Sequence, residues 1–170
     1  MKALRRSIRR SGAFSLVALL LVACWPYGFA GGGLPSHIRT VAILPFDNET
    51  ASPELQRELF EQMRRTIEGR LGLRDAPESR ADAVVRGAIT RYEPDVAIGY
   101  TADRIVTSAR RKLQVTIDVE IVDQTTGKTL WERKGLTGDG EYDESAEASG
   151  RRVAIEKIVN DVIEGAQSQW

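Results

Sequence analysis

The most regular alternation of apolar and polar residues lies between residues 113 and 122. Every second residue from Leu113 to Ile121 is a branched aliphatic one, and the residues between them are polar. A period of two predicts a strand with one buried and one solvated face. The extended pattern around it covers 104–122. This is longer than the usual strand of about 3–10 residues, so we expect a bulge or break near Ser108 and Ala109.

A hairpin is predicted directly after this strand. Residues 123–128 are polar, and Gly127 can adopt the positive φ that a tight turn needs. A return strand is expected from Thr129 to Glu132. The glycines that follow predict a corner before the last helix, at Gly135, Gly138 and Gly140.

Two further strands are expected earlier in the chain. Residues 39–46 are mostly apolar and β-branched, and they are followed by the turn-forming pair Asp47 and Asn48. Residues 82–92 form a second β-branched run, after which Pro94 marks a bend.

Two amphipathic helices complete the pattern. Ser52 can cap the first, with Pro53 at its first position and an end near Gly69 or Gly72. Its apolar stripe consists of Leu55, Leu59, Phe60, Met63, Ile67 and Leu71. Asp143 can cap the second helix, whose stripe consists of Ile155, Ile158, Val159, Val162, Ile163 and Ala166.

The order of these elements is β-α-β-β-β-α. It predicts an α+β fold in which two helices pack on one face of a four-stranded sheet. A right-handed crossover would make the first two strands parallel if they are neighbours, so the sheet is expected to be mixed. Strand order is not determined by the pattern.

The N-terminus has the pattern of an export signal. Five basic residues and no acidic residue lie in 1–23, and an uncharged apolar run covers 13–23. Eleven helical residues rise only about 16 Å, which is too short for a hydrocarbon core of about 30 Å. Residues 1–23 are therefore predicted to be a signal peptide and not a membrane span.

The end of this signal resembles a bacterial lipobox, Leu21-Val22-Ala23-Cys24. The resemblance implies cleavage between Ala23 and Cys24, with a diacylglycerol on the thiol and an N-acyl chain on the new terminus. Cys24 is the only cysteine, so it has no disulfide partner in the chain. The alternative is an ordinary signal peptide with an incidental cysteine.

Glycine and proline are concentrated between the signal and the first strand. Residues 24–37 are therefore expected to form a lipidated tether, and 38–170 a single domain. Position 25 is Trp and not Asp, the residue that resembles an inner-membrane retention signal in enteric lipoproteins. The expected location is the outer membrane.

The net charge of the chain differs from that of the part that follows the predicted signal peptide. The whole chain has 24 basic and 24 acidic residues, but five of the basic ones lie in the signal. The remainder has a net charge of −5, which argues against nucleic acid as a partner.

No catalytic or metal-binding constellation is evident in the sequence. His37 is the only imidazole, and in a flexible tether it would lack the fixed partner that a catalytic or zinc-binding histidine needs. We therefore expect a protein that is not an enzyme and holds no cofactor or metal, apart from the acyl groups on Cys24.

One basic cluster is a candidate for binding lipid or a partner, because arginine suits bidentate capture of phosphates. It consists of Arg104, Arg110, Arg111 and Lys112. The alternative is an ordinary solvated strand, since Asp103, Asp118 and Glu120 lie close by in the sequence.

Together with the lipobox, several segments resemble the LptE family of lipopolysaccharide-assembly lipoproteins. The most specific is the start of the domain, Gly33-Leu34-Pro35-Ser36-His37-Ile38-Arg39-Thr40-Val41-Ala42. The likeness extends over 27–29, 31–43, 45–50, 81–89 and 122–132. It covers essentially the whole mature chain.

This resemblance implies the same two-helix, four-stranded fold and a partnership with the LptD β-barrel. The protein would plug the barrel lumen, assist its assembly and help deliver lipopolysaccharide to the outer leaflet. It would be lipid-anchored, with the domain facing the periplasm or inside the lumen. A different envelope lipoprotein, such as a penicillin-binding-protein activator or a curli-type secretion subunit, remains an alternative, since these share a similar first strand. A lipid-binding accessory to a periplasmic enzyme is a further one.

Overall fold

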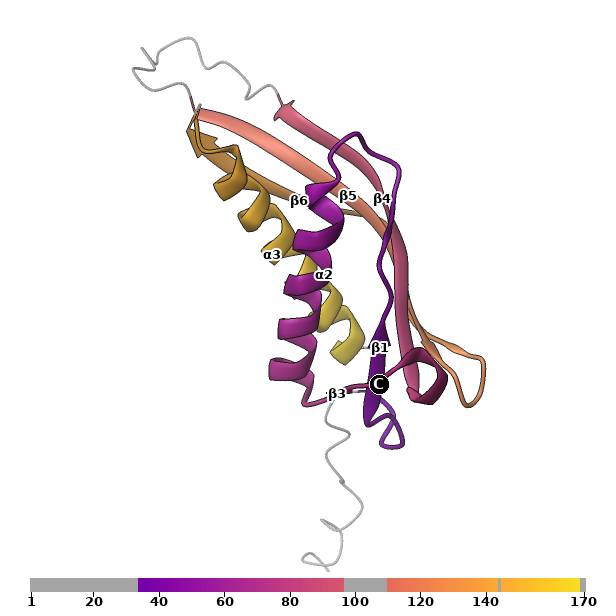
Figure 1. Cartoon of the computed structure of the whole chain (residues 1–170). Helices are drawn as coiled ribbons and strands as arrows, with labels where there is room; N and C mark the ends of the chain where they lie inside the picture. The colour runs from indigo at the N-terminus through magenta and orange to yellow at the C-terminus, as the bar shows by residue number, and fades with distance from the viewer. Residues whose placement is uncertain (1–33, 97–109, 144, 169–170) are drawn as a thin grey trace, which may run out of the picture. The chain divides into compact units, whose positions relative to one another are not determined.

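The computed structural model describes residues 34–96, 110–143 and 145–168. All of them belong to one compact unit, Gly32–Trp170. The predicted break in the long strand and the residues of the signal peptide lie outside the described residues. The main elements (Figure 1) are β1 Thr40–Ile43, β2 Asp47–Asn48, α2 Glu54–Thr66, β3 Arg74–Asp75, β4 Ala83–Val96, β5 Arg110–Asp123, β6 Thr129–Asp143 and α3 Glu147–Ser168.

A single mixed sheet has the strand order β3-β1-β4-β5-β6, with β2 also paired to β4. The strands β1 and β2 are parallel to β4, whereas β5 is antiparallel to both of its neighbours, β4 and β6. The predicted α+β class and mixed sheet are confirmed. The strand count is six and not four. The pair Asp47 and Asn48, which was predicted to be a turn, forms the two-residue strand β2, and the two-residue β3 adds an edge.

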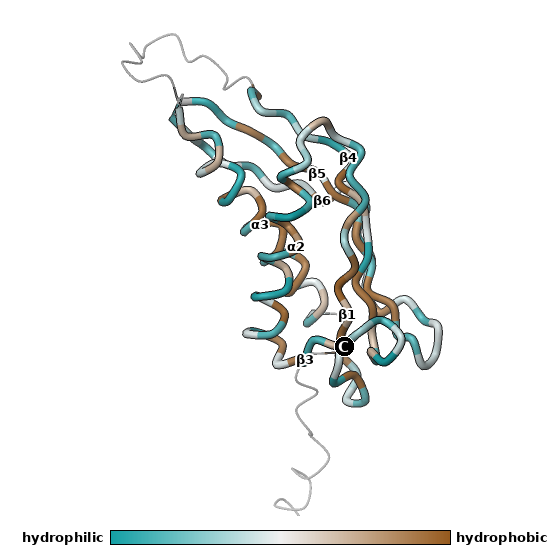
Figure 2. Tube along the Cα trace, viewed as in Figure 1, coloured by the Kyte–Doolittle hydropathy of each residue, from teal (hydrophilic) through white to brown (hydrophobic). Residues whose placement is uncertain are grey.

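Both helices cover the same face of the sheet (Figure 1). The main buried core is formed by residues of these helices and of β1, β4, β5 and β6, and these elements contain the apolar stretches of the trace (Figure 2). Leu55, Leu59 and Met63 of α2 are buried, as the predicted stripe requires. A π-helical turn, Ile67–Leu71, continues α2 to Gly72, which has a φ of 65°. The buried face of α3 includes all the predicted members, Ile155, Ile158, Val159, Val162, Ile163 and Ala166.

The helix starts differ from the prediction. Pro53 is the N-cap of α2, and no side chain caps it. Asn48 organises the preceding loop instead: its Nδ2 donates to the Ser52 carbonyl at 2.9 Å, and its Oδ1 accepts from the Thr50 N–H at 3.0 Å. Asp143 is the last residue of β6, and α3 begins four residues later at Glu147.

The predicted glycine corner is wrong, because all three glycines are residues of strand β6. Gly138 and Gly140 lie under α3. A Cβ on Gly138 would lie 2.2 Å from the Ala154 carbonyl oxygen, and one on Gly140 would lie 2.0 Å from that of Gly150. These glycines allow the helix backbone to approach the strand closely. Gly135, at φ 65°, lies at the register shift between β5 and β6.

Strand β4 is longer than predicted and contains Pro94. The pairing with β5 shifts register between Glu93 and Val96. Proline has no N–H for the ladder, so an irregular segment is the place where a strand tolerates it. Pro94 therefore marks an irregularity in the strand, and not the bend that ends it.

Candidate functional site

The sheet face opposite α2 and α3 is the main candidate surface, because neither of these two helices covers it (Figure 1). Polar members of the alternating strands point to this side. Arg86 of β4 donates through Nε to Glu120 Oε1 of β5 at 2.6 Å. The hydroxyls of Thr116 and Thr137 lie 3.4 Å apart across β5 and β6. We call this surface, centred on Arg86, Thr116, Glu120 and Thr137, the open face.

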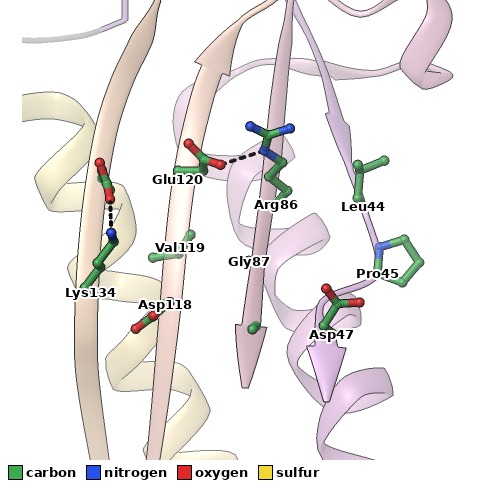
Figure 3. A pocket seen from close by; sticks show the side chains of 11 residues that line it. Leu44, Pro45, Asp47, Arg86, Gly87, Asp118, Val119, Glu120 and Lys134 are labelled. Carbon is green, nitrogen blue, oxygen red and sulfur yellow. Dashed lines mark hydrogen bonds and ion pairs between the residues drawn. The ribbon is translucent and has the colours of Figure 1, made fainter. Parts of the chain in front are cut away.

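A depression of about 610 Å³ lies on the open face, over β4, β5 and β6 and beside residues 44–47 (Figure 3). Its apolar lining includes Leu44, Pro45 and Val119, together with Gly87 of β4. A Cβ on Gly87 would lie 2.1 Å from the Asp118 carbonyl oxygen. The charged side chains around it are Asp47, Arg86, Asp118, Glu120, Glu132 and Lys134.

Most of these charges are already engaged with one another. Lys134 Nζ lies 3.4 Å from Glu132 Oε1, and Arg86 is paired with Glu120. Asp118 Oδ1 accepts a hydrogen bond of 2.7 Å from the Gly135 N–H. Such a surface can form hydrogen bonds to a polar partner.

The predicted basic cluster is only partly within the described residues. Arg104 lies outside them, and of Arg110 only its place in β5 is described. Lys112 Nζ lies 3.3 Å from Asp139 Oδ2, and Arg111 Nη1 lies 3.5 Å from Asp95 Oδ2. Successive residues of a strand point to opposite faces, so these two do not form one patch. Their role in binding lipid or a partner stays a prediction.

Asp139 connects the open face to α3. Its Oδ2 lies 3.1 Å from Lys157 Nζ of α3 and 3.3 Å from Lys112 Nζ of β5. The hydrogen bond from Lys157, supported by that from Lys112, holds the pKa of the Asp139 carboxyl below its ordinary value. This carboxylate serves as an ion-pair partner, and the described residues contain no cluster of three or more metal-ligating side chains.

An ionic cluster ties α2, α3 and β4 together at the other side of the sheet. Arg151 of α3, with a side chain only 12% exposed, donates to both carboxylate oxygens of Glu58 at 3.2 and 3.3 Å and to Glu147 at 3.0 Å. The Tyr92 hydroxyl donates to the same Glu147 oxygen at 2.5 Å. Burial, together with this bond, raises the pKa of Tyr92, so the phenol stays protonated. The cluster is structural.

His37 has a fixed partner, contrary to the expectation of a free tether residue. Its Nε2 lies 2.9 Å from Oδ2 of Asp123, whose side chain is 2% exposed. The same carboxylate accepts from the Thr126 hydroxyl at 2.7 Å and from the Thr125 N–H at 2.7 Å. Asp123 continues the series of every second residue, Leu113 to Ile121, whose side chains are buried. This position in the sequence could have indicated a buried carboxylate.

These donors give Asp123 a predictable effect on acid stability. The hydrogen bond from Thr126, and then the one from His37, hold the pKa of the Asp123 carboxyl well below its ordinary value, against the opposing effect of burial. The folded-state pKa is the lower one, so the carboxylate stabilises the fold above about pH 4 and loses this effect as pH falls through the folded pKa.

Asp123→Asn should therefore lower the Tm at neutral pH and weaken its further decline in acid, because the amide does not titrate. Thr126→Val should also lower the Tm at neutral pH and make the further decline in acid smaller, because it removes the strongest donor and brings the folded-state pKa of the carboxyl closer to its unfolded-state value. Thermal melts from neutral pH to about pH 3 test both. Parallel pH profiles for Asp123→Asn and the wild type would contradict this role.

Within the part of the chain that the structure describes, no helix is both long and apolar enough to cross a membrane.

Several solved structures share this fold. The PelC dodecamer from Paraburkholderia phytofirmans is 17% identical, with a TM-score of 0.54 over 81% of this chain and 95% of that chain. A protein from Xanthomonas campestris is 10% identical, with a TM-score of 0.53 over 77% of this chain and 87% of that chain. At such identities the likeness concerns the fold alone. No curated protein sequence matches.

The decisive comparison is with protein families. The model of the LptE family, described as lipopolysaccharide-assembly, matches residues 38–166. The match begins two residues before β1 and ends within the last turn of α3, so it includes every described strand and both helices. It agrees with the resemblance carried by the start of the domain and the β5–β6 hairpin. The chain belongs to the LptE family of lipopolysaccharide assembly.

Proposed function

We propose that this protein is a non-enzymatic outer-membrane lipoprotein that plugs the lumen of an LptD-type β-barrel. It would be held in the membrane by acyl chains on Cys24, and it would assist barrel assembly and the transport of lipopolysaccharide to the outer leaflet. The observation that carries the proposal is the family match over residues 38–166.

The surface of the domain supports a place in a wet lumen. The interior of a large membrane barrel is polar, and a plug must therefore present polar groups to it. On the open face the charges are paired with one another, as in Arg86 with Glu120 and Lys112 with Asp139. Val153 is the one large hydrophobic side chain that is exposed among the described residues. This surface suits contact with a polar wall better than contact with lipid tails.

Site-specific photo-cross-linking in native membranes tests the proposal. A cross-linkable residue is placed at Thr116 on the open face and, in a second variant, at Arg152 on the outer surface of α3. A plug is enclosed, so both positions should cross-link to the same large outer-membrane barrel. The tagged, lipidated protein should also co-purify with that barrel in a one-to-one complex.

Other outcomes would contradict the plug. A barrel captured from only one of the two positions would indicate docking on its side. Capture of a peptidoglycan synthase would favour an activator of penicillin-binding proteins. Cross-links in multiples of the chain's own mass would favour a self-assembled structural lipoprotein. A structure with the same fold, PelC, is a dodecamer, so this outcome is worth resolving on the same gels.

A further inference from the structure

Strand β6 forms one edge of the sheet. It is the last strand in the order β3-β1-β4-β5-β6, so within the described part of the chain only β5 pairs with it. The strand is long, Thr129–Asp143, and it contains no proline. A long edge strand presents a row of backbone N–H and C=O groups with which another strand can pair.

The direction of these backbone groups follows from a contact of Thr116 on β5. Its carbonyl accepts a hydrogen bond of 3.3 Å from the Thr90 hydroxyl of β4, so the backbone of Thr116 is directed toward β4 and not toward β6. Thr116 is opposite Thr137 in the β5–β6 register. Hydrogen-bonded and non-hydrogen-bonded pairs alternate in an antiparallel ladder. Thr137 and every second residue after it therefore direct their N–H and C=O groups outward, namely Asp139, Glu141 and Asp143.

Helix α3 runs along this edge strand (Figure 1), with its backbone against Gly138 and Gly140. Asp139 lies two residues after Thr137 and therefore on the open face. Lys157 of α3 reaches its Oδ2 at 3.1 Å from the other face of the sheet, so its side chain passes around the outer side of β6.

The same flank of α3 carries an exposed apolar side chain. Val153 is four residues before Lys157, and residues at this spacing lie on the same side of a helix. Val153 is 42% exposed, and it is the one large hydrophobic side chain that is exposed among the described residues. An apolar contact site therefore lies beside the unpaired edge.

We propose that an extended segment of the barrel partner adds to the sheet along the outer edge of β6, beside residues 137–143. This inference rests on the proposed function, which encloses the domain in that barrel. On the side of α3, the added strand places an apolar side chain against Val153. On the open face its side chains are basic or polar, because their neighbours on β6 include the exposed acids Glu141 and Asp143.

The ion pair between Lys157 and Asp139 protects the edge until the partner binds. A lysine at the edge of a sheet discourages indiscriminate strand pairing. Both side chains are partly exposed, and an ion pair of this kind contributes little to stability. An entering strand can therefore displace Lys157, and a basic residue of that strand can replace it beside Asp139.

Hydrogen exchange of the lipidated protein, alone in detergent and in its complex with the barrel, tests the added strand. The outward N–H groups of Thr137, Asp139, Glu141 and Asp143 should exchange rapidly in the protein alone. In the complex they should exchange about tenfold more slowly, because each gains a hydrogen bond. A photo-cross-linkable residue at position 143 should capture a peptide of the barrel.

The contrary outcomes distinguish this inference from the function on which it rests. Unchanged exchange in a complex that contains the barrel would overturn the added strand and leave the plug intact. Absence of the barrel would overturn both. A captured peptide from a second copy of the chain, or from its own residues 24–33, would show that another strand occupies the edge and would overturn the inference.

Competition for the barrel tests the backbone contact. Wild type and variant are expressed in equal amounts with different tags, and the share of each on the purified barrel is measured. Thr137→Pro removes one outward N–H but no bond to β5, and proline is tolerated at such positions of an edge strand. Its share should fall about fivefold. Thr137→Val keeps the N–H and should compete equally with the wild type.

A second pair of variants tests the side-chain contact and leaves the β6 backbone unchanged. Val153→Asp places a charge where the added strand is apolar, and its share should fall on the order of tenfold. Val153→Ile keeps the apolar surface and should compete equally. Thermal melts of the variants without the barrel show which of them are folded. Equal competition by Val153→Asp would overturn the inference even if Thr137→Pro does not fold.

Discussion

Replacing Gly140 by Ala is expected to lower the free energy of unfolding by about 3 kcal/mol, at the upper end of the usual cost of overpacking. The added Cβ would lie 2.0 Å from the carbonyl oxygen of Gly150 and 2.8 Å from its carbonyl carbon. These are backbone atoms of α3, so no side-chain rotation can relieve the clash. The helix itself must move away from β6.

Moving α3 is costly because the contact is tight along its length. Gly138 on the same strand faces the Ala154 carbonyl, and Gly165 near the helix end lies against the Trp131 ring. A shift at one point would therefore open gaps among the buried aliphatic residues of α3, which include Ile158 and Val162. Chemical denaturation of the wild type and of Gly140→Ala measures the effect.

Gly69→Ala is the matched control. Gly69 lies in the π-helical turn after α2, no atom lies within 4 Å of an added Cβ, and its φ is not positive. Alanine there should be neutral, or it should stabilise by up to about 0.5–1 kcal/mol because glycine is entropically unfavourable in helices. Equal stability of Gly140→Ala and Gly69→Ala would show that α3 is not held closely against β6.

The same glycines mark a limit of sequence-based prediction. The alternation from Leu113 to Ile121 and the stripes of both helices predicted strand β5, α2 and α3, because burial on one face leaves a local period. Gly138 and Gly140 were assigned to a corner, since glycine is frequent in turns. Glycine is needed at these two positions because the backbone of α3, a helix that comes later in the chain, lies directly against them. The local sequence pattern contains no information about that contact.

The residues of the candidate site were likewise predicted only in part from the sequence. The alternation of apolar and polar residues predicts which side chains lie on the open face. It does not predict their ion-pair partners, because most partners come from another strand or helix. His37 and Asp123 are 86 residues apart, so a residue assigned to the tether from its glycine-rich surroundings is in fact held by the domain. Likewise, two adjacent basic residues, Arg111 and Lys112, suggested one patch, whereas the pleat directs them to opposite faces.

Cys24→Ser is expected to abolish acylation and to leave the signal uncleaved after Ala23, so that the protein no longer reaches the outer-membrane fraction. Each buried methylene of an acyl chain contributes about 0.8 kcal/mol, and more than one chain is needed for stable anchoring. Fractionation and incorporation of labelled fatty acid are the measurements. Since Cys24 is the only cysteine, any label on a thiol must be at this position.

Trp25→Asp separates lipidation from destination. This variant keeps Cys24 and should still be acylated and cleaved, but it acquires a residue that resembles the inner-membrane retention signal of enteric lipoproteins. In an enteric host we expect it to be membrane-bound in the inner-membrane fraction, and to lose its cross-link to the outer-membrane barrel. If Cys24→Ser stays membrane-bound and is cleaved at the same site, the lipid anchor is wrong. If Cys24→Ser behaves as expected but Trp25→Asp behaves like the wild type, the lipid anchor is supported. The rule that Asp after the lipidated cysteine retains a lipoprotein in the inner membrane would then not apply to this chain.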